Sequence, residues 1–122
     1  DIRTLAAPLD KALYRPDQIP ENFYTNLYQW LETYVTRLGQ EELSRDNRRQ
    51  RMNRINPKYV LRNYLAHQAI EKAESGDYAM IHELLDLVRR PYDDQPGRED
   101  FAKKRPEWAR TQPGCSMLSC SS

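Results

Sequence analysis

The chain has 122 residues, 39% of them hydrophobic, and a formal net charge of +1 at pH 7. With a mean hydropathy of −0.95, it can bury only a thin core of its own, and we expect it to pack against something else. No apolar run approaches the roughly 20 residues that span a bilayer, and no signal peptide is recognisable. The composition therefore excludes membrane insertion and predicts an intracellular or organellar protein.

Residues 1–21 are predicted to be a connector with one helical turn. Pro8, Pro16 and Pro20 interrupt short apolar patches, and proline removes a donor that a helix interior needs. The first residue is Asp1 rather than Met, and no targeting pattern follows it. We therefore expect a fragment whose connector continues from an upstream polypeptide.

An amphipathic helix is predicted from Asn22 to about Glu42. Its apolar residues fill one arc of a helical wheel: Phe23, Leu27, Trp30, Leu31, Tyr34, Val35 and Leu38. An aromatic stripe could form a ligand platform, but aromatic side chains at helical spacing are usually buried. We expect this face to be core.

A weaker helix, which Ser44 can cap, should follow through an arginine-rich run whose only apolar anchors are Met52 and Ile55. Seven basic residues face a single acid, Asp46, in this stretch: Arg45, Arg48, Arg49, Arg51, Arg54, Lys58 and Arg62. Such clusters can bind phosphate backbones, yet no RNA-binding signature or stacking aromatic is interleaved here. We expect a solvated or ion-paired face. The alternative is a stand-alone helical module that binds an acidic partner or nucleic acid.

Two further helices should form a tight hairpin. Asn56 can act as N-cap of a helix that begins at Pro57, and Ser75-Gly76-Asp77 ends that helix and caps the next. The last helix then ends before Pro91. Its expected buried face holds Tyr78, Met80, Ile81, Leu84, Leu85, Leu87 and Val88.

Polar residues at the start of the hairpin are candidate structural residues. Arg62 projects from the middle of the apolar arc of the predicted third helix. A buried guanidinium needs a carboxylate or carbonyl partner, so we expect structural pairing, with phosphate contact as the alternative. Asn63, on the more polar side, can tie a loop to the helix. No catalytic set is predicted, because no base, nucleophile and oxyanion donor converge by spacing.

The remaining residues, 91–122, are rich in proline and glycine and predict an irregular docking tail with one short helix at residues 100–104. Tyr92, Phe101 and Trp108 are the expected anchors. The fold class is therefore all-α, with about four helices including the hairpin. The predicted organisation is a connector (1–21), a helical region (22–90) and this tail (91–122).

Metal and nucleotide sites are not predicted in this chain. His67 and His82 with Cys115 and Cys120 match no common zinc spacing. The glycines are isolated, so no phosphate-binding loop is present, and no acidic metal motif accompanies them. Two cysteines are too few for a disulfide scaffold and are candidates for redox chemistry.

A series of short motifs begins at Asn56. These motifs are Asn56-Pro57, Leu61-Arg62-Asn63, Leu65-Ala66, Ala69-Ile70, Ala73-Glu74, Gly76-Asp77, Pro91-Tyr92, Pro106-Glu107-Trp108 and Ser119-Cys120-Ser121-Ser122. Together they resemble the C-terminal region of the selenoprotein O family. Residues 22–55 are similar to it more loosely, through Trp30, Tyr34, Arg37 and Leu38.

The resemblance implies a protein adenylyltransferase with a kinase-like fold, which transfers AMP from ATP to hydroxyl groups of protein substrates. The ligands of ATP and Mg²⁺ would lie in an upstream kinase-like core, so no catalytic residue is assigned here. Cys120 matches the family's terminal selenocysteine or cysteine and would be a redox residue. Cys115 departs from the pattern, which leaves open whether Cys120 pairs with it or with a core cysteine. We expect a cytoplasmic protein in bacteria or a mitochondrial one in eukaryotes.

Overall fold

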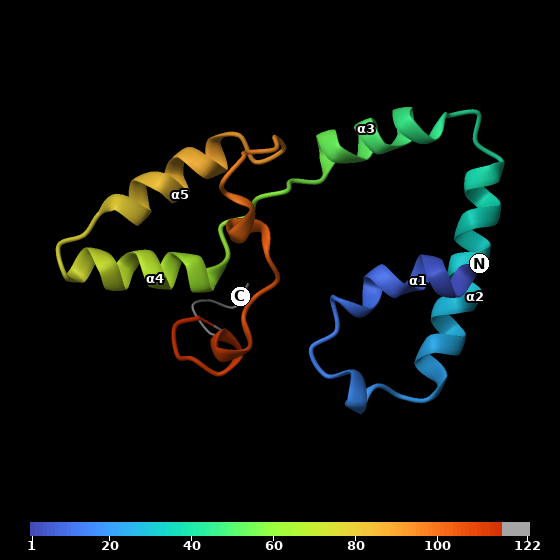
Figure 1. Ribbon diagram of the computed structural model, residues 1–122, viewed down its shortest axis with the longest axis horizontal. Helices are drawn as coiled ribbons and strands as arrows, with labels where there is room; N and C mark the ends of the chain where they lie inside the picture. Colours follow the sequence, from blue (N-terminus) through green and yellow to red (C-terminus); the bar gives the residue numbers. More distant parts are fainter. Residues whose placement is uncertain (116–122) are drawn as a thin grey trace. The chain divides into compact units, whose positions relative to one another are not determined.

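The computed structural model describes residues 1–115, which contain five α-helices, three short 3-10 helices and no strand (Figure 1). This confirms the all-α fold class. The chain divides into two compact units, one of residues 1–44 and one beginning at Arg45. None of the described helices is long and apolar enough to cross a membrane.

The first unit pairs α1 (Ile2–Asp10) with α2 (Asn22–Gly39), and the 3-10 helix Pro16–Gln18 lies between them. The prediction of a single helical turn in residues 1–21 is wrong, because α1 has nine residues. The Asp1 carboxylate caps it by accepting from the Arg3 backbone N–H at 3.2 Å, and Ala6 is buried. Tyr24 also donates its hydroxyl to Asp10 across the pair at 3.1 Å.

Helix α2 confirms the predicted amphipathic helix, but its aromatic face is not core in this unit. Leu31 is the buried residue of α2, whereas Trp30 is 57% exposed and stacks on the less exposed Tyr34 (37%) with ring centroids 5.3 Å apart. The physical reason is length: nine residues of α1 cannot cover eighteen residues of α2.

In the second unit, α3 (Arg45–Ile55) confirms the predicted arginine-rich helix, and none of its residues is buried. The next prediction is wrong. Asn56 does not cap a following helix, because its side-chain nitrogen donates back to the Met52 carbonyl oxygen at 2.9 Å and so ends α3. Helix α4 (Asn63–Glu74) begins only at Asn63.

Residues 56–62 are not helical because their backbone bonds to the segment after α5 and places one side chain in the core. The backbone N–H groups of Lys58 and Tyr59 both donate to the Pro91 carbonyl oxygen, at 2.8 and 3.0 Å. This holds Tyr59, 1% exposed, in the core. A helix starting at Pro57 would have to withdraw that side chain.

Helices α4 and α5 (Ala79–Arg89) form the predicted hairpin. Gly76 adopts φ +90° at the turn, and the Asp77 carboxylate accepts from the Ala79 backbone N–H at 3.0 Å. The core of this unit consists of Tyr59, Tyr64, Leu65, Ala69, Leu84, Leu87, Ala109 and Cys115.

The predicted buried face of α5 is only half correct. Leu84 and Leu87 are buried, but Tyr78, Ile81 and Leu85 are exposed. The reason is that the segment after α5 supplies Ala109 and Cys115 to the core and so packs on one side of the hairpin. On the other side, the described residues leave a groove between the two helices open.

The segment after α5 contains the 3-10 helices Glu99–Ala102 and Glu107–Arg110, the first of which lies where a short helix was predicted. Of the predicted anchors, Phe101 packs against the core. Trp108 and Tyr92 are both half exposed, and Trp108 meets the buried Tyr64 edge to face at 6.2 Å between ring centroids. The most buried residues of this segment are the small Ala109 and Cys115, which a search for aromatic anchors does not find.

Candidate functional site

The candidate site is the connection that fastens residues 91–115 to the α4/α5 hairpin, because this segment leads directly to the tail that carries Cys120. Its first contact is the Pro91 carbonyl oxygen, which accepts from the backbone N–H groups of Lys58 and Tyr59, just before α4. Beside it, the Lys58 ammonium donates to the Asp94 carboxylate at 2.7 Å. This hydrogen bond raises the pKa of Lys58 and lowers that of Asp94.

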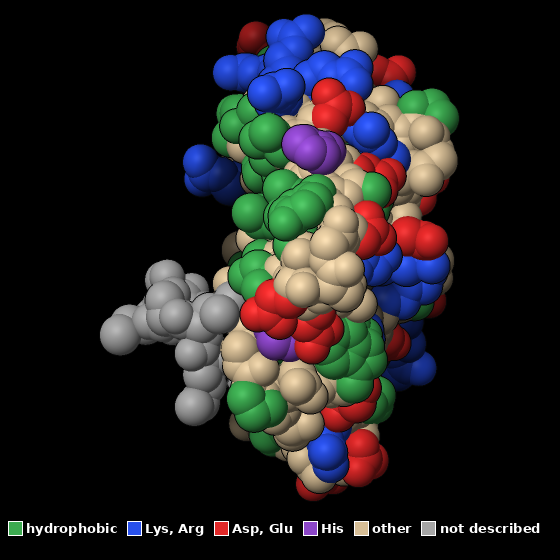
Figure 2. Space-filling view, turned by 90° about the vertical axis from the view of Figure 1, so that its left-hand side faces the viewer, with side chains coloured by type: hydrophobic (Ala, Val, Ile, Leu, Met, Phe, Trp, Pro, Cys, Tyr) green, Lys and Arg blue, Asp and Glu red, His purple; other side chains and the backbone are tan. Residues whose placement is uncertain are grey.

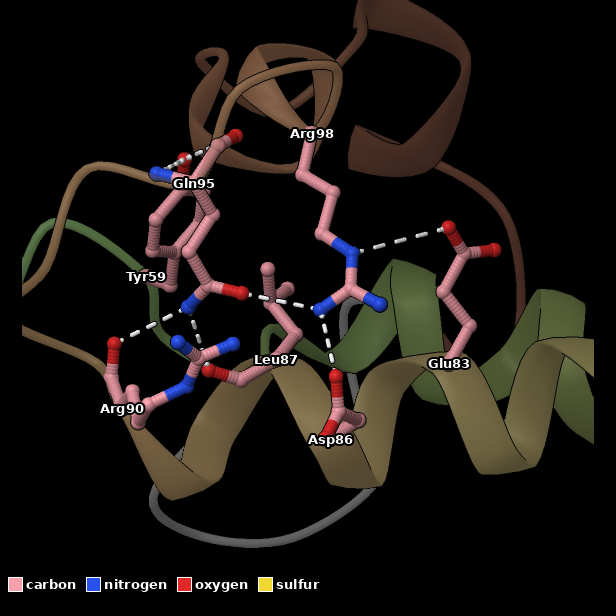
Figure 3. Close-up of polar contacts among 7 residues, drawn as sticks. All are labelled: Tyr59, Glu83, Asp86, Leu87, Arg90, Gln95 and Arg98. Carbon is pink, nitrogen blue, oxygen red and sulfur yellow. Dashed lines mark hydrogen bonds and ion pairs between the residues drawn. The ribbon is translucent and has the colours of Figure 1, made fainter.

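Gln95 is the centre of the connection and is 5% exposed (Figure 3). Its side-chain nitrogen donates to the carbonyl oxygens of Leu87 and Arg90, at 3.0 and 2.9 Å. These carbonyls belong to the last turn of α5 and to its C-cap residue Arg90. They also accept longer backbone hydrogen bonds, from the Arg90 and Asp93 N–H groups at 3.4 and 3.3 Å. Its backbone N–H donates to the Tyr59 hydroxyl oxygen at 3.3 Å. The side chain of Gln95 thus caps α5, and the backbone N–H of the same residue binds Tyr59 in the core.

Arg98 extends this network toward α5. Its Nη1 donates to the Gln95 side-chain oxygen and to the Asp86 carboxylate, both at 2.8 Å, and its Nε lies 4.0 Å from a Glu83 carboxylate oxygen (Figure 3). The hydrogen bond from Arg98, followed by its charge, lowers the pKa of Asp86. We call Tyr59, Asp86, Gln95 and Arg98 the clasp.

Cys115 lies at the far end of the described segment and is 2% exposed. Burial raises the pKa of its thiol, and the nearby negative charge of Glu71 raises it further. The thiolate is the reactive form of cysteine, so this environment disfavours redox chemistry at Cys115. Cys120 lies outside the described residues.

A close packing contact precedes Cys115. Gly114 has φ +84°, and a Cβ atom at this position would lie 3.0 Å from His67 Nδ1. The His67 Nε2 lies 3.2 Å from a Glu71 carboxylate oxygen without the alignment of a hydrogen bond, and it has no other hydrogen-bond partner among the described residues. The ring therefore serves as a surface against which the glycine packs.

The polar residues predicted near the hairpin start do not converge on a site. Arg62 is not part of a helix but precedes α4, with an exposed side chain, so the prediction that it projects from the apolar arc of that helix is wrong. Its structural pairing stays a prediction. Its carbonyl oxygen accepts from Leu65 and Ala66 N–H groups. Asn63 is the first residue of α4, and Asn56 ends α3. Among residues 1–115, no three His, Cys, Asp or Glu side chains are placed to hold a metal ion.

Comparison with known proteins places the chain in a family. The sequence model of the family described as "Protein adenylyltransferase SelO" matches residues 6–89. The chain belongs to the SelO family. The match includes most of the first unit and the part of the second that ends at the last residue of α5. This confirms the resemblance seen in the sequence.

SelO relatives match beyond α5 as well. A "Protein nucleotidyltransferase YdiU" of Rhodopirellula baltica is 53% identical over 117 residues, which cover 93% of the chain and 22% of the relative. The protein of the same name from Xanthomonas axonopodis pv. citri is 56% identical over 116 residues, 88% of the chain and 22% of the relative. That of Azoarcus sp. is 60% identical over 93 residues, 76% of the chain and 18% of the relative. The chain thus spans about a fifth of the length of these SelO relatives.

Proposed function

We propose that this chain is the C-terminal helical part of a SelO-family protein adenylyltransferase, which transfers AMP from ATP to hydroxyl groups of protein substrates. The observation that carries the proposal is the 53% identity to a protein nucleotidyltransferase along 93% of the chain but only 22% of the relative. Most of the relative's polypeptide therefore lies outside the matched region. ATP, Mg²⁺ and the protein substrates bind in that larger part, which has a kinase-like fold.

In this proposal the second unit has a mechanical role. It packs on the kinase-like core, and the clasp fixes the path of residues 91–115 so that the tail starts from a defined place. Two hydrogen bonds support this role. Gln95 donates to the Leu87 carbonyl oxygen at the end of α5, and Arg98 donates to the Asp86 carboxylate on the same helix.

The tail then supplies Cys120 as the redox residue. A low-molecular-weight disulfide such as glutathione disulfide would oxidise it: the Cys120 sulfur and a cysteine sulfur of the core form one S–S bond, and the reagent is reduced to two thiols, which take up the two electrons and both protons. The burial of Cys115 favours a core cysteine as the partner. Restraint of a core loop by this bond would lower AMP transfer. We propose a cytoplasmic location in bacteria and a mitochondrial one in eukaryotes.

The test is a chimera in which this chain replaces the corresponding stretch of the Rhodopirellula baltica relative. AMP transfer from labelled ATP to protein is measured with and without Cys120→Ser, under glutathione disulfide and under reducing conditions. We expect transfer by the reduced chimera, and a reversible loss on oxidation that Cys120→Ser prevents. A folded chimera that binds ATP but transfers no AMP would contradict the assignment, and equal activity in all four states would remove the redox role.

A further inference from the structure

The open side of the α4/α5 hairpin forms an apolar groove of about 310 Å³. Its walls are aliphatic and come from both helices and from Leu61, two residues before α4, namely Leu61, Ala66, Ile70, Ile81, Leu85 and Val88. Within residues 1–115, no charged side chain lines it. The view toward the α4–α5 turn shows hydrophobic side chains exposed at this end of the unit (Figure 2).

The groove is shallow enough that its wall residues remain in solvent. Leu61 is 51% exposed, Ile70 49% and Leu85 48%. Its floor is formed by Ala69 and Leu84, which already belong to the core. The groove is therefore continuous with the packed interior, and its aliphatic walls are a part of the hairpin that the described residues of the second unit leave uncovered.

The arrangement of the walls suits a helix. Ile81, Leu85 and Val88 follow one another at spacings of four and three, which forms a single stripe on α5. Ala66 and Ile70 form the matching stripe on α4 at a spacing of four. Two antiparallel helices with facing stripes are completed by a third helix that packs between them.

We propose that the groove receives an aliphatic helix from the rest of the SelO-family polypeptide, an inference that rests on the proposed function. The matched relatives extend far beyond the region that this chain covers, which is 22% of their length. The family match at residues 6–89 includes both wall helices. The occupant is therefore part of the same longer protein rather than a separate ligand.

The charges at one end of the groove specify the occupant further. Arg62 follows Leu61, and Arg89 follows Val88, and both arginines are exposed. In an antiparallel hairpin the start of α4 and the end of α5 lie at the same end, so both arginines flank the groove at this end. The docking helix should carry an acidic residue there and uncharged aliphatic residues along its middle.

The test compares Leu85→Glu in the 122-residue chain and in the chimera with the Rhodopirellula baltica relative. In the chain alone the urea midpoint should not fall, because Leu85 is half exposed and the glutamate stays hydrated. In the chimera the midpoint should fall, because the same carboxylate would be buried against an apolar helix. Ile55→Glu, on α3 at 73% exposure, is the matched control and should change neither. An equal fall in both proteins, or in neither, would overturn the proposal.

Hydroxyl-radical footprinting of the unmutated chimera gives a second readout that does not depend on a variant folding. Leu61, Ile81 and Leu85 should oxidise as slowly as the core residue Leu87. Rapid oxidation of these three would overturn the docking, and so would protection that increases with protein concentration, which would indicate a second copy as occupant. AMP transfer with a rapidly oxidised groove would leave the proposed function standing and remove only the docking surface.

Discussion

The Gln95 side-chain nitrogen donates a hydrogen bond to the Leu87 carbonyl oxygen at 3.0 Å and thereby ends α5 from outside the helix. Helices often end on a glycine in the left-handed conformation, whose backbone N–H takes up the last carbonyls. Here Arg90 occupies the cap position with φ −129°. Its backbone N–H donates to the Leu87 carbonyl oxygen at 3.4 Å, and the Gln95 side-chain amide adds a second, shorter hydrogen bond. The cap of α5 is therefore also the attachment point of the following segment.

We expect Gln95→Ala to lower the free energy of unfolding of the second unit by about 1–3 kcal/mol, since it removes the two side-chain hydrogen bonds to the Leu87 and Arg90 carbonyl oxygens, each worth about 0.5–1.5 kcal/mol. Urea denaturation followed by circular dichroism measures this. The control is Gln50→Ala, an exposed position of α3, which should change the value by less than about 0.5 kcal/mol. Equal midpoints for Gln95→Ala and the unmutated chain would show that the cap is dispensable.

The ion pair between Arg98 and Asp86 should make stability depend on pH at the acidic end. Because the pKa of Asp86 is lower in the folded state, its contribution is complete above the unfolded value, near pH 4, and is lost as pH falls through the folded value. Asp86→Asn should flatten this part of the pH–stability curve. Asp93→Asn, an exposed carboxylate, serves as control. Curves of the same slope for Asp86→Asn and the unmutated chain would exclude the pair as a contributor.

Two glycine substitutions separate backbone strain from side-chain crowding. Gly76→Ala should cost about 1–2 kcal/mol, because its φ is +90° and a Cβ there meets open space. Gly114→Ala has the same strain and in addition pushes the His67 ring, whose Nδ1 would lie 3.0 Å from the new Cβ. We expect a larger loss of unfolding free energy for Gly114→Ala. Equal losses would show that the ring moves aside freely.

Cys115 should behave as a protected thiol. In a Cys120→Ser background, its reaction with an aromatic disulfide reagent at pH 8 should be much slower in the folded chain than in urea, because burial both blocks access and raises the pKa of the thiol. Reaction at the unfolded rate under native conditions would contradict the packing of this residue and restore it as a redox candidate.

The arginines of α3 should not confer nucleic-acid binding. Replacement of Arg48, Arg49 and Arg51 by Gln should leave retention on immobilised RNA or DNA unchanged at physiological salt, at the background level of the unmutated chain. A complex of the unmutated chain that weakens steeply with salt, as phosphate contacts do, and that the triple variant loses would support the binding-module alternative instead.

The sequence was sufficient for elements whose causes are local. The apolar period of α2 and the Gly76-Asp77 junction predict their helices, because cap, turn and period all lie within a few residues of the element. The start of α4 could not be predicted in the same way. What keeps residues 56–62 out of a helix is the burial of Tyr59 against Gln95, 36 residues away in sequence, and no local pattern encodes such a partner.

The clasp itself was missed for a related reason. Gln95 stands before Pro96 and Gly97, a context that indicates an exposed turn, and a polar residue there gives no sign of burial. A signal did exist, since α5 lacks a glycine C-cap and its last carbonyls needed a donor from elsewhere. The exposure of Ile81 and Leu85 could not be inferred from the apolar period, which marks a face as apolar without saying whether this chain covers it.

The 36-residue separation between Tyr59 and Gln95 also predicts the order in which parts of the second unit fold. Contacts within the hairpin close short loops and form early, whereas a contact that closes a long loop bears a larger entropic cost and forms late. During synthesis the hairpin is complete in sequence before residues 91–115 emerge, so until then α5 lacks the hydrogen bonds from Gln95 and has both of its apolar sides in water. That interval is when this unit is most exposed to aggregation, and chaperone binding would be most useful there.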